Sequence, residues 1–83
     1  FTSSQTLHGG QETTLQKIYQ VVMHFGGIIV TPGFTDGSKF VDGNPYGVGH
    51  VTGPDNQNEL SDTTKTALKH MTERVLTVAG KLA

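Results

Sequence analysis

The first twelve residues constrain the fold more than any later segment. They begin with Phe1–Ser4, which suits the end of a strand, and continue through polar residues to the pair Gly9-Gly10. A segment with helical periodicity then begins at Gln11. Open α/β sheets place ligands at such a strand, loop and helix N-terminus, because free backbone N–H groups and the helix dipole converge there. The sequence therefore predicts an α/β fold with a ligand-facing loop near its start.

A helix and a second strand are expected after this loop. Apolar residues recur every three or four positions between Gln11 and Phe25, which is typical of one face of a helix. Gly26-Gly27 is expected to end this helix. Ile28–Val30 is a short, unbroken β-branched run, as in a central parallel strand that is covered on both faces.

Residues 34–60 form the least regular part of the sequence. Six of the eleven glycines lie between Gly33 and Gly53. A loop of more than about 15 residues inside a compact domain is usually functional or disordered. We expect an ordered excursion, with a turn at residues 44–47 and a short strand over 48–52. The apolar residues expected to anchor it are Phe34, Phe40, Tyr46 and Val51.

A second amphipathic helix is predicted to run to the end of the chain. Ser61 is suited to be its N-cap, and Asp62 lies in its first turn. Its apolar stripe extends from Ala67 to Leu82. The predicted order of elements is strand, helix, strand, long loop, helix, which is half of a doubly wound parallel sheet.

Composition narrows the class of protein further. Hydrophobic residues make up 34% of the 83 residues, which is lean for a domain that folds without a partner. Cysteine is absent, so disulfides and thiol chemistry are excluded, and a reducing compartment, the cytoplasm, is expected. The formal charge of −1 gives no support to nucleic-acid binding. No apolar run approaches the roughly 20 residues that a bilayer span needs.

The pattern alone leaves several roles open. The loop at residues 5–10 suits either a ligand contact or a plain strand-to-helix connection, and it is not a P-loop because no Gly-Lys-Ser/Thr follows. The four histidines match no zinc spacing, so no metal site is predicted. His70 is expected to be solvated. His24, near the end of the first helix, suits either a site or a packed or C-capping role.

Three ordered motifs give the chain a family resemblance. They are Phe1–Ser4 with His8–Thr14, the triplet His24–Gly26, and Gly43–Gly47 followed by Val51–Gly53. Together they resemble the C-terminal part of the flavodoxin-like NAD(P)H:quinone oxidoreductases of the tryptophan-repressor-binding-protein type. The likeness covers essentially the whole chain. It implies that residues 1–83 are the C-terminal part of a single flavodoxin-like domain, within a doubly wound parallel sheet.

The resemblance also implies a cofactor and an assembly. FMN would bind outside the carboxyl ends of the strands, NAD(P)H and a quinone would be the substrates, and the chains would form homodimers or homotetramers. His24 matches the family's histidine beside the flavin. The loop matching the polar edge of the flavin ring consists of Ser4, Gln5, Thr6, Leu7, His8 and Gly9.

The chain departs from the family pattern in two ways, and two other interpretations of its function stay open. The family loop is often richer in glycine than Thr6–His8, and its phosphate-binding turn belongs to an earlier unit that is absent here. The isolated chain is therefore expected to be inactive. One alternative is an FMN-binding electron carrier or sensor with a protein partner, which the long 34–60 segment weakly opposes. The other is a fragment without activity.

Overall fold

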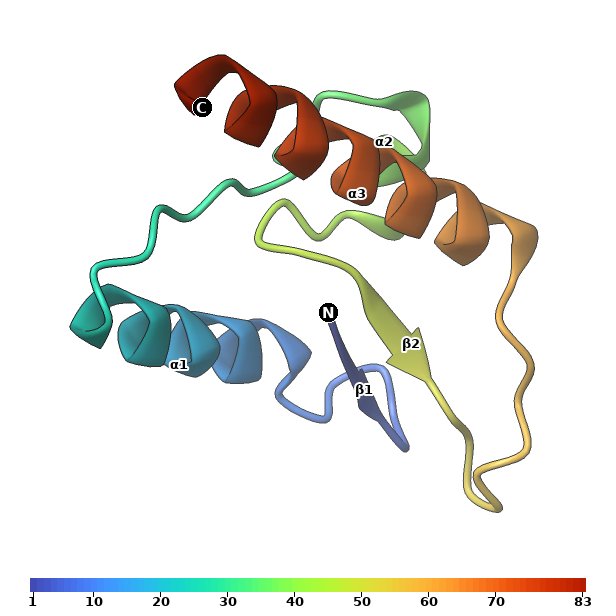
Figure 1. Cartoon of the computed structure of the whole chain (residues 1–83). Helices are drawn as coiled ribbons and strands as arrows, with labels where there is room; N and C mark the ends of the chain where they lie inside the picture. The colour runs from blue at the N-terminus through green and yellow to red at the C-terminus, as the bar shows by residue number, and fades with distance from the viewer.

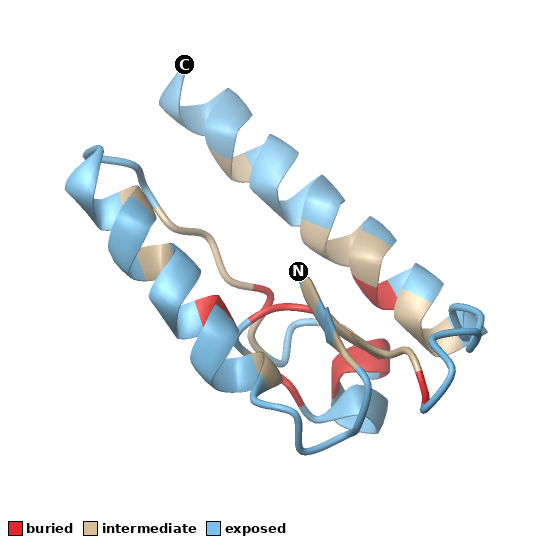
Figure 2. Ribbon diagram, turned by 90° about the horizontal axis from the view of Figure 1, so that it is seen from below, coloured by how far each residue is buried: buried red, intermediate tan, exposed pale blue.

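The computed structural model describes all residues, 1–83, and has an α/β architecture (Figure 1). The small sheet lies between α1 and α3 in both ribbon views (Figures 1 and 2). The elements in chain order are β1 (Thr2–Ser4), α1 (Gln11–His24), α2 (Gly37–Asp42), β2 (Gly49–Val51) and α3 (Asp62–Leu82).

The sheet consists of the two strands β1 and β2, which are parallel. Thr2 pairs with Gly49, and Ser4 pairs with Val51. Two hydrogen bonds extend the ladder beyond the strands: Thr2 N donates to the Val48 carbonyl at 3.0 Å, and Thr52 N donates to the Ser4 carbonyl at 2.8 Å. The predicted α/β class and the strand expected near residues 48–52 are therefore confirmed.

The prediction of a central strand over Ile28–Val30 is wrong for this chain. The segment has no regular secondary structure, and Ile28 is 73% exposed. β2 takes the place beside β1, and no further strand lies next to residues 28–30 to pair with them. An apolar β-branched run favours an extended backbone, but a strand forms only where a neighbour offers hydrogen bonds.

Helix α1 follows the predicted boundaries and packs through a single buried residue. Leu15 is its buried side chain. The helix lies close to the 47–49 backbone, because a Cβ on Gly47 would come within 3.0 Å of the Leu15 side chain. At the other end, Gly26 N donates to the Met23 carbonyl and Gly27 N to that of Val22, a pattern that ends the helix as expected.

Helix α2 lies inside the segment that was expected to be an ordered excursion, although no helix was predicted there. Asp36 caps it, since its carboxylate accepts from the Ser38 backbone N–H at 3.0 Å. The apolar anchors predicted for this segment are largely exposed: Phe34 is 48% and Phe40 73% exposed, although their ring centroids lie 5.3 Å apart. The buried anchor is instead Lys39, which is fully buried.

Helix α3 begins after Ser61, whose hydroxyl accepts from the Thr64 N–H at 3.1 Å, as predicted. The prediction that His70 is solvated is wrong. Its side chain is 23% exposed, and its Nε2 lies 2.6 Å from the Thr35 hydroxyl. Arg74, one turn later, donates to the Thr31 carbonyl at 2.9 Å. These bonds hold α3 against the segment before α2, because His70 and Arg74 on one helix face reach the Thr35 hydroxyl and the Thr31 carbonyl of the same short stretch.

The buried core is small, and its residues lie on all three helices and in the segments beside β2, as the red segments of Figure 2 show. Only Leu15, Val48 and Ala67 are buried hydrophobic residues. Much apolar surface therefore remains exposed on all three helices. No helix combines the length and the apolarity that a membrane span requires.

Candidate functional site at the strand-to-helix loop

The loop between β1 and α1 presents a row of backbone donors. The N–H groups of Thr6, Leu7, His8 and Gly10 donate to no other residue of the chain, whereas Gly9 N donates to the Thr6 carbonyl at 3.2 Å. All residues from Gln5 to Gly10 are exposed. Backbone donors that are left free by the fold are available to acceptor atoms of a ligand.

The start of α1 adds to this donor row. Its N-cap is Gly10, which has a left-handed backbone (φ 80°) and no side chain to cap the first turn. Helix dipole and free first-turn N–H groups favour negative charge here. Glu12 already places a carboxylate in that first turn. The site therefore suits the polar edge of a neutral or weakly charged group better than a phosphate.

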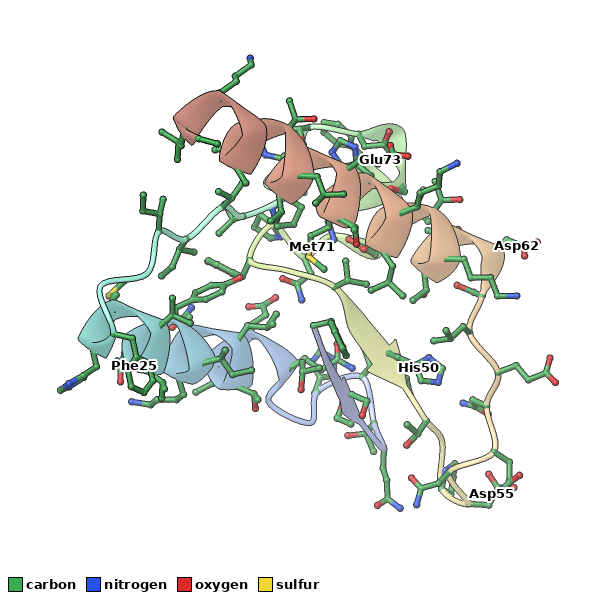
Figure 3. All side chains as sticks on the ribbon, viewed as in Figure 1. Phe25, His50, Asp55, Asp62, Met71 and Glu73 are labelled. Atoms are coloured by element: carbon green, nitrogen blue, oxygen red, sulfur yellow. The ribbon has the colours of Figure 1, made fainter.

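A series of side-chain hydrogen bonds anchors the loop to the sheet and to the start of α1. The Ser4 hydroxyl donates to the Thr6 carbonyl at 2.7 Å. Gln11 Nε2 donates to the Ser4 Oγ at 2.9 Å and to the His50 carbonyl at 3.1 Å. His50 lies on β2, as Figure 3 shows, so this network ties the loop to both α1 and the sheet.

A cavity of about 280 Å³ lies beside the donor row. Leu7, His8 and Gly10 line one part of it, and Asp42 and Asn44 from the end of α2 line another. A larger cavity of about 620 Å³ shares Leu7, Asp42 and Asn44 with it. The excursion that contains α2 therefore forms a wall next to the loop, which gives that segment a place in the candidate site.

The α2 wall is held by the buried Lys39. Its Nζ donates to the Asp42 carboxylate at 2.8 Å and to the Gly47 carbonyl at 2.7 Å. Asn44 in turn accepts from the Tyr46 N–H at 3.0 Å, which closes the predicted turn at residues 44–47. A buried cation with two acceptors fixes both ends of this segment, because leaving either acceptor unpaired inside the protein is costly.

His24 lies at the opposite end of α1 from the loop (Figure 1). Fourteen helical residues span about 20 Å, so one small ring cannot contact both places within one chain. His24 is exposed, and the histidine side chains that form hydrogen bonds are those of His50 and His70. The alternative of a packed His24 is therefore wrong, whereas its place in the last turn of α1 is compatible with the C-capping alternative. Phe25 next to it is also exposed (Figure 3).

The sequence-predicted site residues thus form two groups. The structure brings Ser4, Gln5, Thr6, Leu7, His8 and Gly9 together in one loop and leaves His24 apart. Sequence reasoning missed Gln11 and Asp42, which border the same region. The Asp36-x-Ser38 spacing, an N-cap followed by a polar residue, was the signal for the helix that carries Asp42. No cluster of three or more His, Asp or Glu side chains is placed to hold a metal ion.

Comparisons with known proteins identify relatives of the chain. No protein-family model matches it. A Deinococcus radiodurans protein named NAD(P)H dehydrogenase (quinone) is 40% identical over 82 residues, which cover 98% of this chain and 40% of the relative. Relatives of the same name from Methylocella silvestris and Chromohalobacter salexigens are 38% and 33% identical, over 99% and 100% of this chain and 44% of each relative.

The chain therefore spans less than half the length of these curated relatives. The relationship to NAD(P)H:quinone oxidoreductases that the motifs predicted is confirmed.

Proposed function

Because the chain is a homologue of the NAD(P)H dehydrogenases (quinone), we propose that it forms part of an FMN-dependent oxidoreductase that reduces quinones with NAD(P)H. In this proposal, residues 1–83 are the C-terminal part of one flavodoxin-like domain. Strands β1 and β2 then belong to its larger, doubly wound parallel sheet. The loop between β1 and α1 lies at the carboxyl end of β1, where such sheets bind their ligands.

The observation that carries the proposal is the row of unpaired amides at Thr6, Leu7, His8 and Gly10. A flavin ring has acceptor atoms along its polar edge, so its chemistry fits a row of neutral donors. The carboxylate of Glu12 in the next turn disfavours a phosphate at the same place. The loop therefore fits the ring of FMN and leaves the phosphate to another part of the protein.

When bound, FMN supplies the redox chemistry, accepting hydride from NAD(P)H and passing reducing equivalents to the quinone. The residues of this chain bind and orient it. The loop amides stabilise negative charge along the polar edge of the ring. The exposed side chain of Leu7 offers apolar surface to the ring face, while Ser4, Gln5 and Gly9 shape the loop.

His24 contributes to the site of a neighbouring chain in this proposal. It lies about 20 Å along α1 from the loop of its own chain. It is exposed beside Phe25 and Met23, which are 85% and 63% exposed. An exposed histidine amid apolar side chains suits a contact between copies of the chain. Such an assembly, a homodimer or homotetramer, would bring His24 to a second flavin.

The proposal is tested with a chimera in which this chain replaces the matching segment of the Deinococcus radiodurans relative. We expect the chimera to bind FMN in a fluorescence-quenching titration and to oxidise NAD(P)H when benzoquinone is supplied. The remaining segment of the relative, without this chain, is the control and should bind FMN at least tenfold more weakly. A folded chimera that binds no FMN would rule the proposal out.

A second variant addresses His24 separately. His24→Ala in the chimera should weaken FMN retention or lower the rate of quinone reduction. Gln20→Ala, one turn earlier on an exposed part of α1, is the matched control. Unchanged FMN affinity together with unchanged quinone kinetics would remove His24 from the site.

A further inference from the structure

We propose that Gln11 is the positioning residue that holds the 5–9 loop in its flavin-binding shape. The inference rests on the proposed function, and it adds a residue that does not itself contact the ring. Gln11 is the first residue of α1 and is half-buried against the sheet. It is the one side chain that connects the loop, through Ser4, to the backbone of β2.

The orientation of the Gln11 amide is fully determined by its partners. The His50 carbonyl only accepts hydrogen bonds, so the Gln11 NH₂ group must face it, at 3.1 Å. The second proton of that NH₂ group goes to the Ser4 Oγ at 2.9 Å. The Gln11 Oε1 occupies the space where a Cβ on Gly49 would lie, so the glycine on β2 makes room for this arrangement.

Ser4 relays this constraint to the loop. Because Gln11 donates to its oxygen, the Ser4 hydroxyl proton is directed to the Thr6 carbonyl, at 2.7 Å. Gly9 N donates to the same carbonyl at 3.2 Å, so both of its lone pairs are engaged. The Thr6 carbonyl is thereby held on the inner side of the loop.

The direction of the donor row follows from this one carbonyl. In a trans peptide, the C=O and the following N–H point in opposite directions. All peptide bonds of the chain are trans, so an inward Thr6 carbonyl turns the Leu7 N–H outward. The Gln5 carbonyl accepts from Gly53 N at 3.1 Å and turns the Thr6 N–H away from that contact in the same way. Gln11 thus fixes the direction of the central donor.

The test uses two variants of the chimera described above and one control. Gln11→Met keeps the length of the side chain and removes both donated hydrogen bonds. Gln11→Glu keeps the shape but cannot donate to the His50 carbonyl. Gln16→Met, on an exposed position of the same helix, is the matched control. FMN affinity is measured by fluorescence quenching, and amide hydrogen exchange of residues 5–10 is measured in the absence of FMN.

We expect Gln11→Met to weaken FMN binding about tenfold, as the loss of two hydrogen bonds predicts, with Gln16→Met unchanged. Exchange of the Gly9 N–H, which is protected by its hydrogen bond to the Thr6 carbonyl, should accelerate in the FMN-free Gln11→Met protein. A carboxylate at Gln11→Glu should also lower the midpoint potential of bound FMN, because it opposes negative charge on the reduced ring. FMN affinity within twofold of the parent, with unchanged exchange, would overturn the inference.

The experiment separates this inference from the proposed function. If the parent chimera binds no FMN, the proposed function fails, and the exchange measurement alone decides the role of Gln11. If the Gln11→Met variant does not fold, the Gln11→Glu variant tests the role of Gln11 instead. Ser4→Ala combined with Gln11→Met should cost no more FMN affinity than either change alone, since both break one relay. Additive losses would contradict the relay.

Discussion

At the scale of single residues, Gly9 shows how closely the loop is packed on itself. A Cβ at this position would lie 2.7 Å from the Ser4 Cβ, 2.9 Å from the Ser4 Oγ and 3.1 Å from the Thr6 carbonyl oxygen. These are the two groups that shape the donor row. A side chain on Gly9 would therefore displace the Ser4 relay before it reached any ligand.

We predict that Gly9→Ala lowers the free energy of unfolding by about 1–3 kcal/mol, the usual cost of overpacking. Gly37→Ala is the matched control, because a Cβ there meets nothing within 4 Å and its φ is not positive. That change, in the first turn of α2, should stabilise the protein by about 0.5 kcal/mol. Urea unfolding measures the stability of both variants. Equal midpoints would contradict the prediction that a side chain at Gly9 is overpacked against Ser4 and Thr6.

At the scale of elements, α2 owes its position to the residues at its two ends. Hydrogen bonds from the Ser38 hydroxyl and the Ser38 backbone N–H lower the pKa of Asp36 below its ordinary value of 3.8, and His70 acts in the same direction. The Ser38 hydroxyl lies 2.6 Å from the carboxylate, and the His70 Nδ1 lies 4.0 Å from it. The Asp36 cap thus links α2 to α3 electrostatically.

The sign of the pH dependence follows from the lowered pKa of Asp36. Because this carboxylate is harder to protonate in the folded chain, its contribution to stability is present above about pH 4. The contribution is lost as the pH falls through the folded pKa. Asp36→Asn retains a capping side chain but does not titrate. The difference in melting temperature between parent and variant should therefore shrink on acidification, and a constant difference from pH 7 to pH 3 would contradict this role.

Lys39 controls the other end of α2. Lys39→Met should destabilise the protein by about 3 kcal/mol, because it leaves the Gly47 carbonyl and the Asp42 carboxylate without their donor. Lys69→Met is the control. Lys69 is 78% exposed, and its ion pair with Glu73, at 4.0 Å, is worth only about 0.3 kcal/mol. Chemical denaturation measures the free energy of unfolding of both variants. If Lys39→Met lowers it as little as Lys69→Met does, the two hydrogen bonds of Lys39 do not hold the end of α2.

At the scale of the whole molecule, the chain exposes more surface than its mass predicts. Its accessible surface is 5721 Å², whereas a folded monomer of 8.9 kDa exposes roughly 4,800 Å². The excess of roughly 900 Å² resembles the ~800 Å² that one partner contributes to a standard protein interface. Part of the exposed apolar surface lies around Ile28, Val75 and Leu82, which border a cavity of about 460 Å³.

This surface predicts different dye binding in the isolated chain and in the chimera. The 83-residue chain alone should increase the fluorescence of an apolar dye such as anilinonaphthalene sulfonate. The chimera should increase it less per molecule, because additional sequence covers part of the apolar surface. Ile28→Ser and Leu82→Ser in the isolated chain should reduce the signal. Equal dye fluorescence from the chain and the chimera would show that this surface stays uncovered.

The sequence predicted those features that depend on local patterns. The boundaries of α1, the Ser61 cap of α3 and the strand near residue 49 follow from periodicity and capping, and they are confirmed. Whether Ile28–Val30 forms a strand could not be predicted from its own residues, because a strand needs a neighbouring strand that the local sequence does not reveal. Lys39 was missed for a similar reason, since only the fold shows that a lysine is surrounded by two acceptors.

The loop of the candidate site was located from its sequence, but its shape was not. The strand, glycine pair and helix start indicate where donors gather, whereas the Gln11–Ser4–Thr6 relay depends on distances between β1, α1 and β2. Likewise, the resemblance placed both the loop and His24 beside a flavin, in pockets that neighbouring chains complete. Only the length of α1 shows that they are far apart within a single chain.

Hydrogen–deuterium exchange of the chimera with and without FMN tests the central claim most directly, because the claim concerns four backbone amides. Exchange at Thr6, Leu7, His8 and Gly10 should slow when FMN is added. Exchange in the exposed last turn of α3, residues 79–82, should stay unchanged. If FMN binds while the four amides exchange as fast as before, they do not contact the flavin, and the proposed site is wrong.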